Sequence, residues 1–172
     1  ITRLRQICDT PALFMDYAGD SGKLDSLREL LSQIKESDHR VLIFSQFRGM
    51  LDITEGLLQE LGISSYKLTG STPSDSRQEM TRAFNQGSRD AFLISLKAGG
   101  VGLNLTGADT VILIDLWWNP AVEMQAISRA HRIGQEQNVE VYRLITRGTI
   151  EEKILELQEG KKNPTKGSVT LR

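Results

Sequence analysis

Short apolar runs alternate with amphipathic stretches along this chain of 172 residues. Five runs rich in β-branched or aromatic residues have the length and composition of buried strands: Val41–Phe44, Ser65–Leu68, Ala91–Ser95, Thr110–Asp115 and Val139–Ile145. Sequence of helical or loop character separates each run from the next, which is typical of a parallel sheet with helices on both faces. The pattern therefore predicts an α/β fold with three layers, α/β/α, around a mostly parallel central sheet.

Helices are predicted between these strands from apolar residues at helical spacing. Two stripes mark the first two helices: Leu24, Leu27, Leu31 and Ile34, then Met50, Ile53, Leu57 and Leu61. Gly62 is a suitable stop for the second helix, because glycine accepts the left-handed conformation common after a helix end. Thr72 and Pro73, with Asp75 behind them, predict an N-cap, a first-turn proline and an acidic first turn for a helix ending near Gly87.

The two ends of the chain differ in composition from the middle. Residues 1–22 carry a short amphipathic stripe that breaks at Pro11 and leads into a polar turn, so we interpret them as a leader that packs against the domain. Residues 161–172 contain basic residues and no acid, a composition that rarely orders by itself. We therefore predict one domain over residues 23–160, followed by a basic tail that is disordered or truncated.

Composition excludes several classes of protein. A single cysteine, Cys8, rules out an internal disulfide framework, and two histidines, His39 and His131, form no cluster with metal-ligand spacing. The chain has neither an apolar run near the about 18 residues of a membrane span nor the pattern of a signal peptide, so we expect a soluble, intracellular protein. With a net charge of -1, any contact with DNA has to come from a local basic patch.

Two arginines and a glutamine share one stripe of a predicted helix that opens at Asn119-Pro120. At about 100° per residue, Gln125, Arg129 and Arg132 fall within roughly 60° of one another. A separate apolar stripe anchors this helix in the core: Val122, Ala126, Ala130 and Ile133. Guanidinium groups are permanently charged and match phosphate oxygens two at a time, so the pair suits a transferring phosphoryl group. The competing interpretation is a solvated basic face of the helix.

Two further loops suit phosphate groups, and both directly follow predicted strands. After the third run, three glycines follow Ser95 and Lys97, the first of them being Gly99, and their exposed amides are able to cradle a phosphate. After the second run, Gly70 lies among hydroxyl residues before the helix that carries Arg77, which makes an anion seat at a helix N-terminus. The competing interpretations are a glycine-rich turn and an ordinary helix start. Ligands of parallel sheets gather at the carboxyl ends of strands, so all these residues are expected on one rim.

The run that ends in Asp115 has the appearance of a Walker B strand, whose acid holds magnesium. We reject this interpretation because the chain contains no phosphate loop of the form G-x-x-x-x-G-K-[ST]. Trp117 and Trp118, which follow, are interpreted as wedge and core residues, since no alternation of basic and aromatic residues surrounds them. No metal-binding residue is therefore assigned.

Taken together and in this order, five segments closely resemble the second RecA-like lobe of SWI/SNF-type DNA-translocating ATPases, which are similar to superfamily-two helicases: Val41–Phe47, Gly70–Arg77, Ser95–Asp109, Asp115–Pro120 and Gln125–Gln135. The resemblance runs from about Leu4 to Gly160, and the arginine segment followed by Ile133-Gly134-Gln135 is highly specific to that family. Ser128 and Asn104 differ from conventional strand-separating helicases, and both differences are usual in the SWI/SNF-type branch.

The resemblance implies a motor of two lobes, with ATP in the cleft between them and duplex DNA across both. The N-terminal RecA-like lobe of the full-length chain would hold most of ATP and Mg²⁺, while this lobe would supply Arg129 and Arg132 as catalytic arginine fingers, with Gln125 completing the ATP contacts. The expected DNA-binding residues are Gly70, Arg77, Ser95, Lys97 and Gly99. The isolated lobe is therefore predicted to be inactive.

Two alternative functions stay open: a lobe of a strand-separating helicase, and a passive module that docks DNA or protein. A DNA-bound protein is the expected target of the motor, and the sequence does not name it. The segment Arg147–Lys153 is more typical of prokaryotic than of eukaryotic chains, which favours the cytoplasm or nucleoid over the nucleus.

Overall fold

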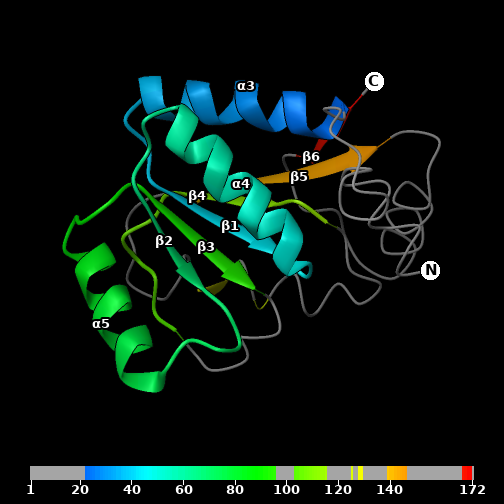
Figure 1. The fold of residues 1–172 in the computed structure, drawn as a ribbon. Coiled ribbons are helices and arrows are strands. Elements are labelled where there is room, and N and C mark those ends of the chain that lie inside the picture. The colour runs from blue at the N-terminus through cyan, green and yellow to red at the C-terminus, as the bar shows by residue number, and fades with distance from the viewer. Residues whose placement is uncertain are drawn as a thin grey trace.

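The computed structural model describes residues 22–95, 103–115, 125, 128–129, 139–146 and 168–171. Three helices and six strands are defined within them, and their chain order is visible in Figure 1. They are α3 (Gly22–Glu36), β1 (Val41–Ser45), α4 (Arg48–Glu60), β2 (Ser65–Leu68), α5 (Ser74–Asn85), β3 (Ala91–Ser95), β4 (Thr110–Leu113), β5 (Glu140–Thr146) and β6 (Ser168–Leu171). All five predicted strands are present, with ends within two residues of the predicted bounds.

The six strands form one sheet in the order β2-β3-β1-β4-β5-β6, and every neighbouring pair is parallel. β1 lies in the middle, where Phe44 is in register with Ile94 of β3 on one side and with Leu113 of β4 on the other. All residues of β1 and β3 are buried, as expected of central strands covered on both faces. The predicted parallel α/β fold is confirmed.

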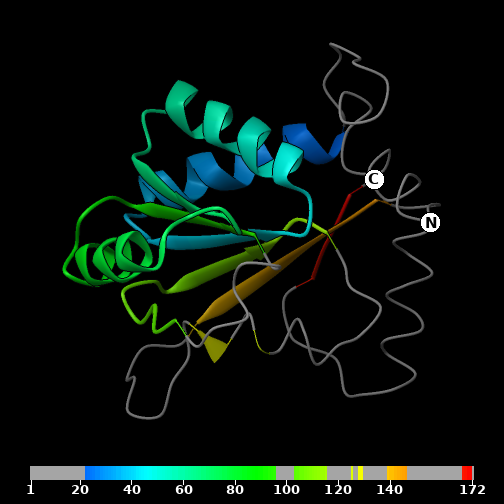
Figure 2. The same cartoon turned by 60° about the horizontal axis from the view of Figure 1, so that its bottom comes forward.

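Helices cover both faces of the sheet and form two separate cores (Figure 2). Alternate residues of β1 point to opposite faces, so Ile43 packs with α3 and α4 while Phe44 packs with Phe84 of α5. Phe84 and Phe92 meet edge to face, with ring centroids 5.4 Å apart. The predicted three-layer arrangement is therefore confirmed, and so are the apolar stripes of α3 and α4, most of whose members are buried.

The ends of the helices agree with the sequence in one case and differ in another. Gly62 follows α4 with a φ of 70°, the left-handed conformation expected for a helix stop. The prediction that Thr72 caps α5 is wrong: the N-cap is Pro73, and no side chain bonds the free amides there. The Thr72 hydroxyl instead accepts a 3.0 Å hydrogen bond from the amide of Thr69, because the loop before the helix folds back on itself.

The structure also contains a strand where no order was predicted. Ser168–Leu171, inside the predicted basic tail, form β6 and pair in parallel with β5 from Arg143 to Thr146. The physical reason is that β5 would otherwise be an edge strand with unpaired backbone groups, which any neighbouring extended segment can satisfy. Residues 1–21 of the predicted leader (1–22) lie outside the described residues, and Gly22 already begins α3. No helix in the described part is long and apolar enough to cross a membrane.

Asp109 joins the amino ends of three strands. Its carboxyl group accepts hydrogen bonds from the Arg40 amide (3.1 Å) and from Nδ1 of His39 (2.8 Å). Its backbone carbonyl accepts a 3.0 Å bond from the amide of Glu140 in β5. The hydrogen bond from His39 to the Asp109 carboxylate, together with the negative charge of Asp109, raises the pKa of His39 above its ordinary value, and the charges of Glu140 and Asp38 act in the same direction.

We expect this pair to make stability depend weakly on pH. Since the pKa of His39 is higher in the folded chain than in the unfolded one, its contribution is fully present below about pH 6.5 and is lost as pH rises through the folded pKa. The imidazole is 43% exposed, so the contribution should stay below about 1 kcal/mol. NMR titration of His39 measures the shift, and Asp109→Asn should lower its pKa. An unchanged pKa in that variant would contradict the assignment.

Candidate nucleotide and DNA site

The order of the strands singles out one point on the carboxyl edge of the sheet. From β1 the chain continues toward β2 on one side, and from β4 it continues toward β5 on the other, so the strand order reverses between β1 and β4. Crevices at such reversal points are where open α/β sheets bind their ligands. The residues at this point are Ser45, the last residue of β1, and Asp115, two residues after β4.

Ser45 and Asp115 form a buried hydrogen-bonded network at this reversal point. The Ser45 hydroxyl donates to Oδ2 of Asp115 at 2.8 Å, and the amide of Gln46 donates to the same oxygen at 2.7 Å. The amide of Phe47 donates to the Ser45 hydroxyl at 3.0 Å. Asp115 thereby joins the turn between β1 and α4 to the end of β4, from which the chain continues toward the arginine segment.

Two of the expected DNA-binding residues, Gly70 and Ser95, lie at the carboxyl ends of adjacent strands. Ser95 ends β3 and is in register with Ser45, while Gly70 lies two residues beyond the end of the neighbouring strand β2. Gly70 is exposed, and a methyl group added there would meet nothing within 4 Å, so its backbone is open to a ligand. The structure therefore brings Gly70 and Ser95 to one rim, as predicted.

Arg77 is engaged with the loop that precedes its own helix. Its Nε donates to the carbonyl of Thr72 at 2.8 Å, and its Nη2 donates to the carbonyls of Gly70 (3.2 Å) and Thr69 (3.3 Å). These bonds fix the shape of the loop around Gly70. Direct contact between Arg77 and a DNA phosphate stays a prediction.

The arginine segment is described at three positions, Gln125, Ser128 and Arg129. Gln125 is exposed, and its carbonyl accepts a 2.8 Å bond from the Ser128 hydroxyl. Arg129 is 9% exposed, and its backbone carbonyl accepts a 2.9 Å bond from the amide of Leu105. The backbone of Arg129 is thus held against the stretch that follows the glycine-rich loop. Arg132, Lys97 and Gly99 lie outside the described residues.

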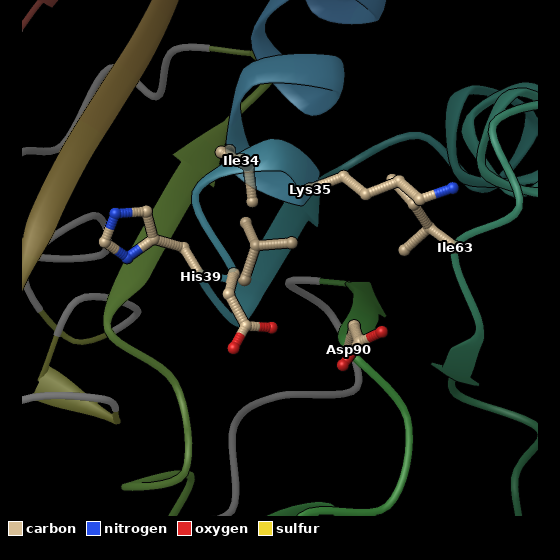
Figure 3. Close-up of a pocket in the computed structure, with 7 residues that line it drawn as sticks. Ile34, Lys35, His39, Ile63 and Asp90 are labelled. Carbon is tan, nitrogen blue, oxygen red and sulfur yellow. The ribbon is translucent and has the colours of Figure 1, made fainter.

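Two hollows on the described part of the chain do not coincide with this rim. One, of about 20 Å³, lies at the amino ends of the strands between α3 and the start of β1, with Ile34, His39 and Asp90 around it (Figure 3). It has room for a water molecule and not for a nucleotide. The other, of about 460 Å³, is an open groove between α5 and Leu103–Asn104. Among the described residues, no group of three or more His, Cys, Asp or Glu side chains is placed to hold a metal ion.

Sequence reasoning missed the contact between Ser45 and Asp115. A magnesium-ligand role for Asp115 was weighed and rejected, and Asp115 and Ser45 were assigned to two separate family motifs with no contact predicted between them. The available signal was that a hydroxyl and an acid each directly follow a buried strand run, which places both on the carboxyl edge.

Comparison with known proteins places this geometry in context. The helicase conserved C-terminal domain family matches residues 22–134. The mouse protein "SWI/SNF-related matrix-associated actin-dependent regulator of chromatin subfamily A member 1" is 45% identical over 92% of this chain and 16% of its own length. "Putative ATP-dependent helicase/translocase YwqA" of Bacillus subtilis is also 45% identical, over 92% of this chain and 18% of its own.

A solved structure shares the fold. The C-terminal part of the Fun30 ATPase domain superposes with a TM-score of 0.76 at 38% identity, covering 95% of this chain and 55% of that one. The fold is therefore RecA-like. The chain spans under a fifth of the length of the curated relatives named above.

Proposed function

Because the chain belongs to the helicase conserved C-terminal domain family, in its SWI/SNF-type branch, we propose that it is the second motor lobe of an ATP-dependent duplex-DNA translocase. In this proposal the lobe opens and closes against an N-terminal RecA-like lobe as ATP binds and is hydrolysed. It acts in the compartment that holds the DNA. The mouse and Bacillus relatives share the same 45% identity, so the comparisons do not favour a prokaryotic origin over a eukaryotic one.

The observation that carries the proposal is the bond between the Leu105 amide and the Arg129 carbonyl. It joins Arg129 to the stretch that leaves the glycine-rich loop, and we propose that a shift at one of them displaces the other through this bond. In a translocase the nucleotide and the DNA have to be coupled in this way. Chains of hydrogen bonds between two sites are one route for such coupling when the connected element has two discrete arrangements.

On the nucleotide side, Arg129 and Arg132 are proposed to reach the γ-phosphate of ATP bound mainly by the first lobe, with Gln125 beside them. Mg²⁺ is assigned mainly to that first lobe, as the resemblance to SWI/SNF-type ATPases implies. This lobe supplies positive charge where negative charge develops in the transition state, which is the role of an arginine finger. By itself it should not hydrolyse ATP. Turnover by the purified 172-residue chain would refute this part.

On the DNA side, Gly70, Ser95, Lys97 and Gly99 are proposed to grip the phosphates of one strand. The three carbonyl bonds of Arg77 favour a role in shaping the loop around Gly70. Contacts of this kind position a protein on DNA without reading its sequence. A motor that moves along any sequence requires such contacts.

The experiment that tests the proposed function separates movement from strand separation. We expect the full-length protein to displace the third strand of a DNA triplex in an ATP-dependent way, because its grip is on phosphates. A forked duplex should stay paired under the same conditions, since no stacking array of aromatic residues is predicted. Efficient unwinding of the fork would favour the strand-separating helicase. DNA binding without activity in either assay would favour the passive docking module.

For DNA binding, Lys97→Ala in the full-length protein should weaken affinity equally for all sequences. The slope of log K against log salt should fall by about one unit, the value for one lost phosphate contact. Lys67→Ala is the matched control. Lys67 is already paired with Asp52 (2.8 Å) and Glu55 (3.1 Å), so its replacement should leave the slope unchanged. An unchanged slope for Lys97→Ala, or a loss that depends on sequence, would contradict the proposed DNA face.

A comparison of Arg77→Ala with Lys97→Ala distinguishes the two roles of Arg77. A direct phosphate contact predicts the same loss of slope as for Lys97. Loop shaping predicts weaker binding with little change of slope, because no charge is removed from the interface itself.

A further inference from the structure

Asp115 has a buried side chain that the proposed nucleotide and DNA contacts leave unused. It is 1% exposed, and one of its oxygens, Oδ2, accepts two hydrogen bonds from described residues. The other oxygen, Oδ1, has no partner among the described residues. Buried polar atoms are normally paired, and a group that is only half paired calls for an explanation.

Stability is a weak explanation for this side chain. A buried charged group loses its hydration, and a well-packed apolar side chain of similar size is often as stabilising or more so. Directional bonds supply something that an apolar contact lacks, which is a fixed geometry. The 2.7 and 2.8 Å distances are those of strong hydrogen bonds to a carboxylate.

The geometry that Asp115 fixes lies at the reversal point of the sheet. On one side it holds the amide of Gln46 and the hydroxyl of Ser45, where the chain turns from β1 into α4. On the other side it stands ten residues before Gln125, at the start of the connection that leads to the arginine segment. That segment is held a second time, by the bond from Leu105 to Arg129.

We propose that Asp115 is a positioning residue: by bonding to the β1–α4 turn it fixes the point from which the chain continues toward Arg129, and thereby helps to set where Arg129 stands. Ser45 is its partner in this role. The inference rests on the proposed function, because it concerns the placement of the arginines that act on ATP. Misplacement of catalytic groups by about 1 Å can cost on the order of a hundredfold in rate.

The test uses DNA-stimulated ATP hydrolysis by the full-length protein. Asp115→Ala should lower kcat by roughly 30- to 100-fold, with KM for ATP within about twofold, because the arginines act mainly on the transition state. Asp115→Asn keeps one oxygen that can accept both bonds, so it should retain most of kcat. Ser45→Ala removes one donor and is the milder variant, expected to lower kcat about tenfold. It tests the same role if Asp115→Ala fails to fold.

Thr54→Val is the matched control. Thr54 is also fully buried, and its hydroxyl donates a 2.8 Å bond to the Met50 carbonyl inside α4, away from the arginine segment. It should lower the melting temperature without lowering kcat. In the double variant Ser45→Ala with Asp115→Ala, kcat should be no lower than with Asp115→Ala alone, since both act through one network.

Two results would overturn the positioning role. In the first, folded Asp115→Ala and Ser45→Ala proteins keep kcat within twofold of the wild type. In the second, Thr54→Val loses as much kcat as they do at an equal loss of melting temperature. A wild-type protein that fails to hydrolyse ATP on duplex DNA would instead overturn the proposed function, so the two failures are distinct.

Discussion

Replacement of Arg132 by alanine in the full-length protein should lower DNA-stimulated ATP hydrolysis by about a thousandfold or more. An arginine that stabilises charge on the transferring phosphoryl group contributes roughly 4 kcal/mol to the transition state. Lysine should not restore the rate, because an ammonium group cannot form the two parallel bonds of a guanidinium. Steady-state hydrolysis with saturating duplex DNA measures the effect.

Arg129→Ala should have a similar effect on hydrolysis, with one difference. Arg129 is only 9% exposed in this lobe, so its loss should also lower stability, and melting temperature has to be measured beside the rate. Arg28→Ala serves as the control for both variants, because Arg28 forms an exposed ion pair with Glu60 on the helical layer. Near wild-type turnover of a folded Arg132→Lys protein would exclude the finger role.

Arg40→Ala should strongly destabilise the domain. The guanidinium of Arg40 donates to three backbone carbonyls, those of Gly107 (2.8 Å), Arg89 (2.6 Å) and Ser88 (3.2 Å). It also lies 4.0 Å from the centre of the Phe84 ring. Together these contacts join the start of β1 to the segments before β3 and β4.

We expect Arg40→Ala to cost about 3 kcal/mol, since bonds to charged groups contribute roughly 1.5–3 kcal/mol each and water replaces part of them at this half-buried site. For a domain of this size the melting temperature should fall by roughly 9 °C. Arg28→Ala, which breaks only a surface pair, should change stability by less than about 0.5 kcal/mol. Thermal unfolding of both variants is the measurement. Equal losses of melting temperature would contradict the role of Arg40 in joining these segments.

Gly107 lies very close to both Arg40 and Asn85. A Cβ at Gly107 would lie 2.7 Å from Nη1 of Arg40 and 2.9 Å from Cα of Asn85. The Asn85 side chain in turn accepts a bond from the Gly107 amide at 3.0 Å. The close approach of two backbones therefore requires glycine here, and sequence reasoning assigned it no role.

Much of the fold followed from local sequence. Strands with every residue buried read as continuous apolar runs, and apolar stripes such as Leu27–Leu31 and Met50–Leu57 marked the buried faces of α3 and α4. Gly62 follows a helix at positive φ, and the ease with which glycine adopts this conformation is a property of one residue. These features depend on neighbours within a few positions, so the sequence alone determined them.

The sequence also placed Gly70 and Ser95 on one rim, because parallel strands carry their carboxyl ends to the same edge. Prediction from the sequence failed for contacts between residues far apart in the chain and for a strand that is ordered only by pairing with its neighbour. β6 was not predicted, since its order depends on pairing with β5 and not on its own composition. The cap of α5 was wrong because Thr72 bonds back into its own loop.

Only the tertiary structure decided the role of the side chains that join distant segments. Ser45 and Asp115 are 70 positions apart, and Arg40 and Gly107 are 67 positions apart, yet each pair forms a 2.8 Å hydrogen bond. No period or spacing along the chain encodes such a pairing, because it depends on the strand order that places β4 beside β1. The sequence determined the residue types at the rim and the family they belong to, and the packing of the sheet determined which of them act together.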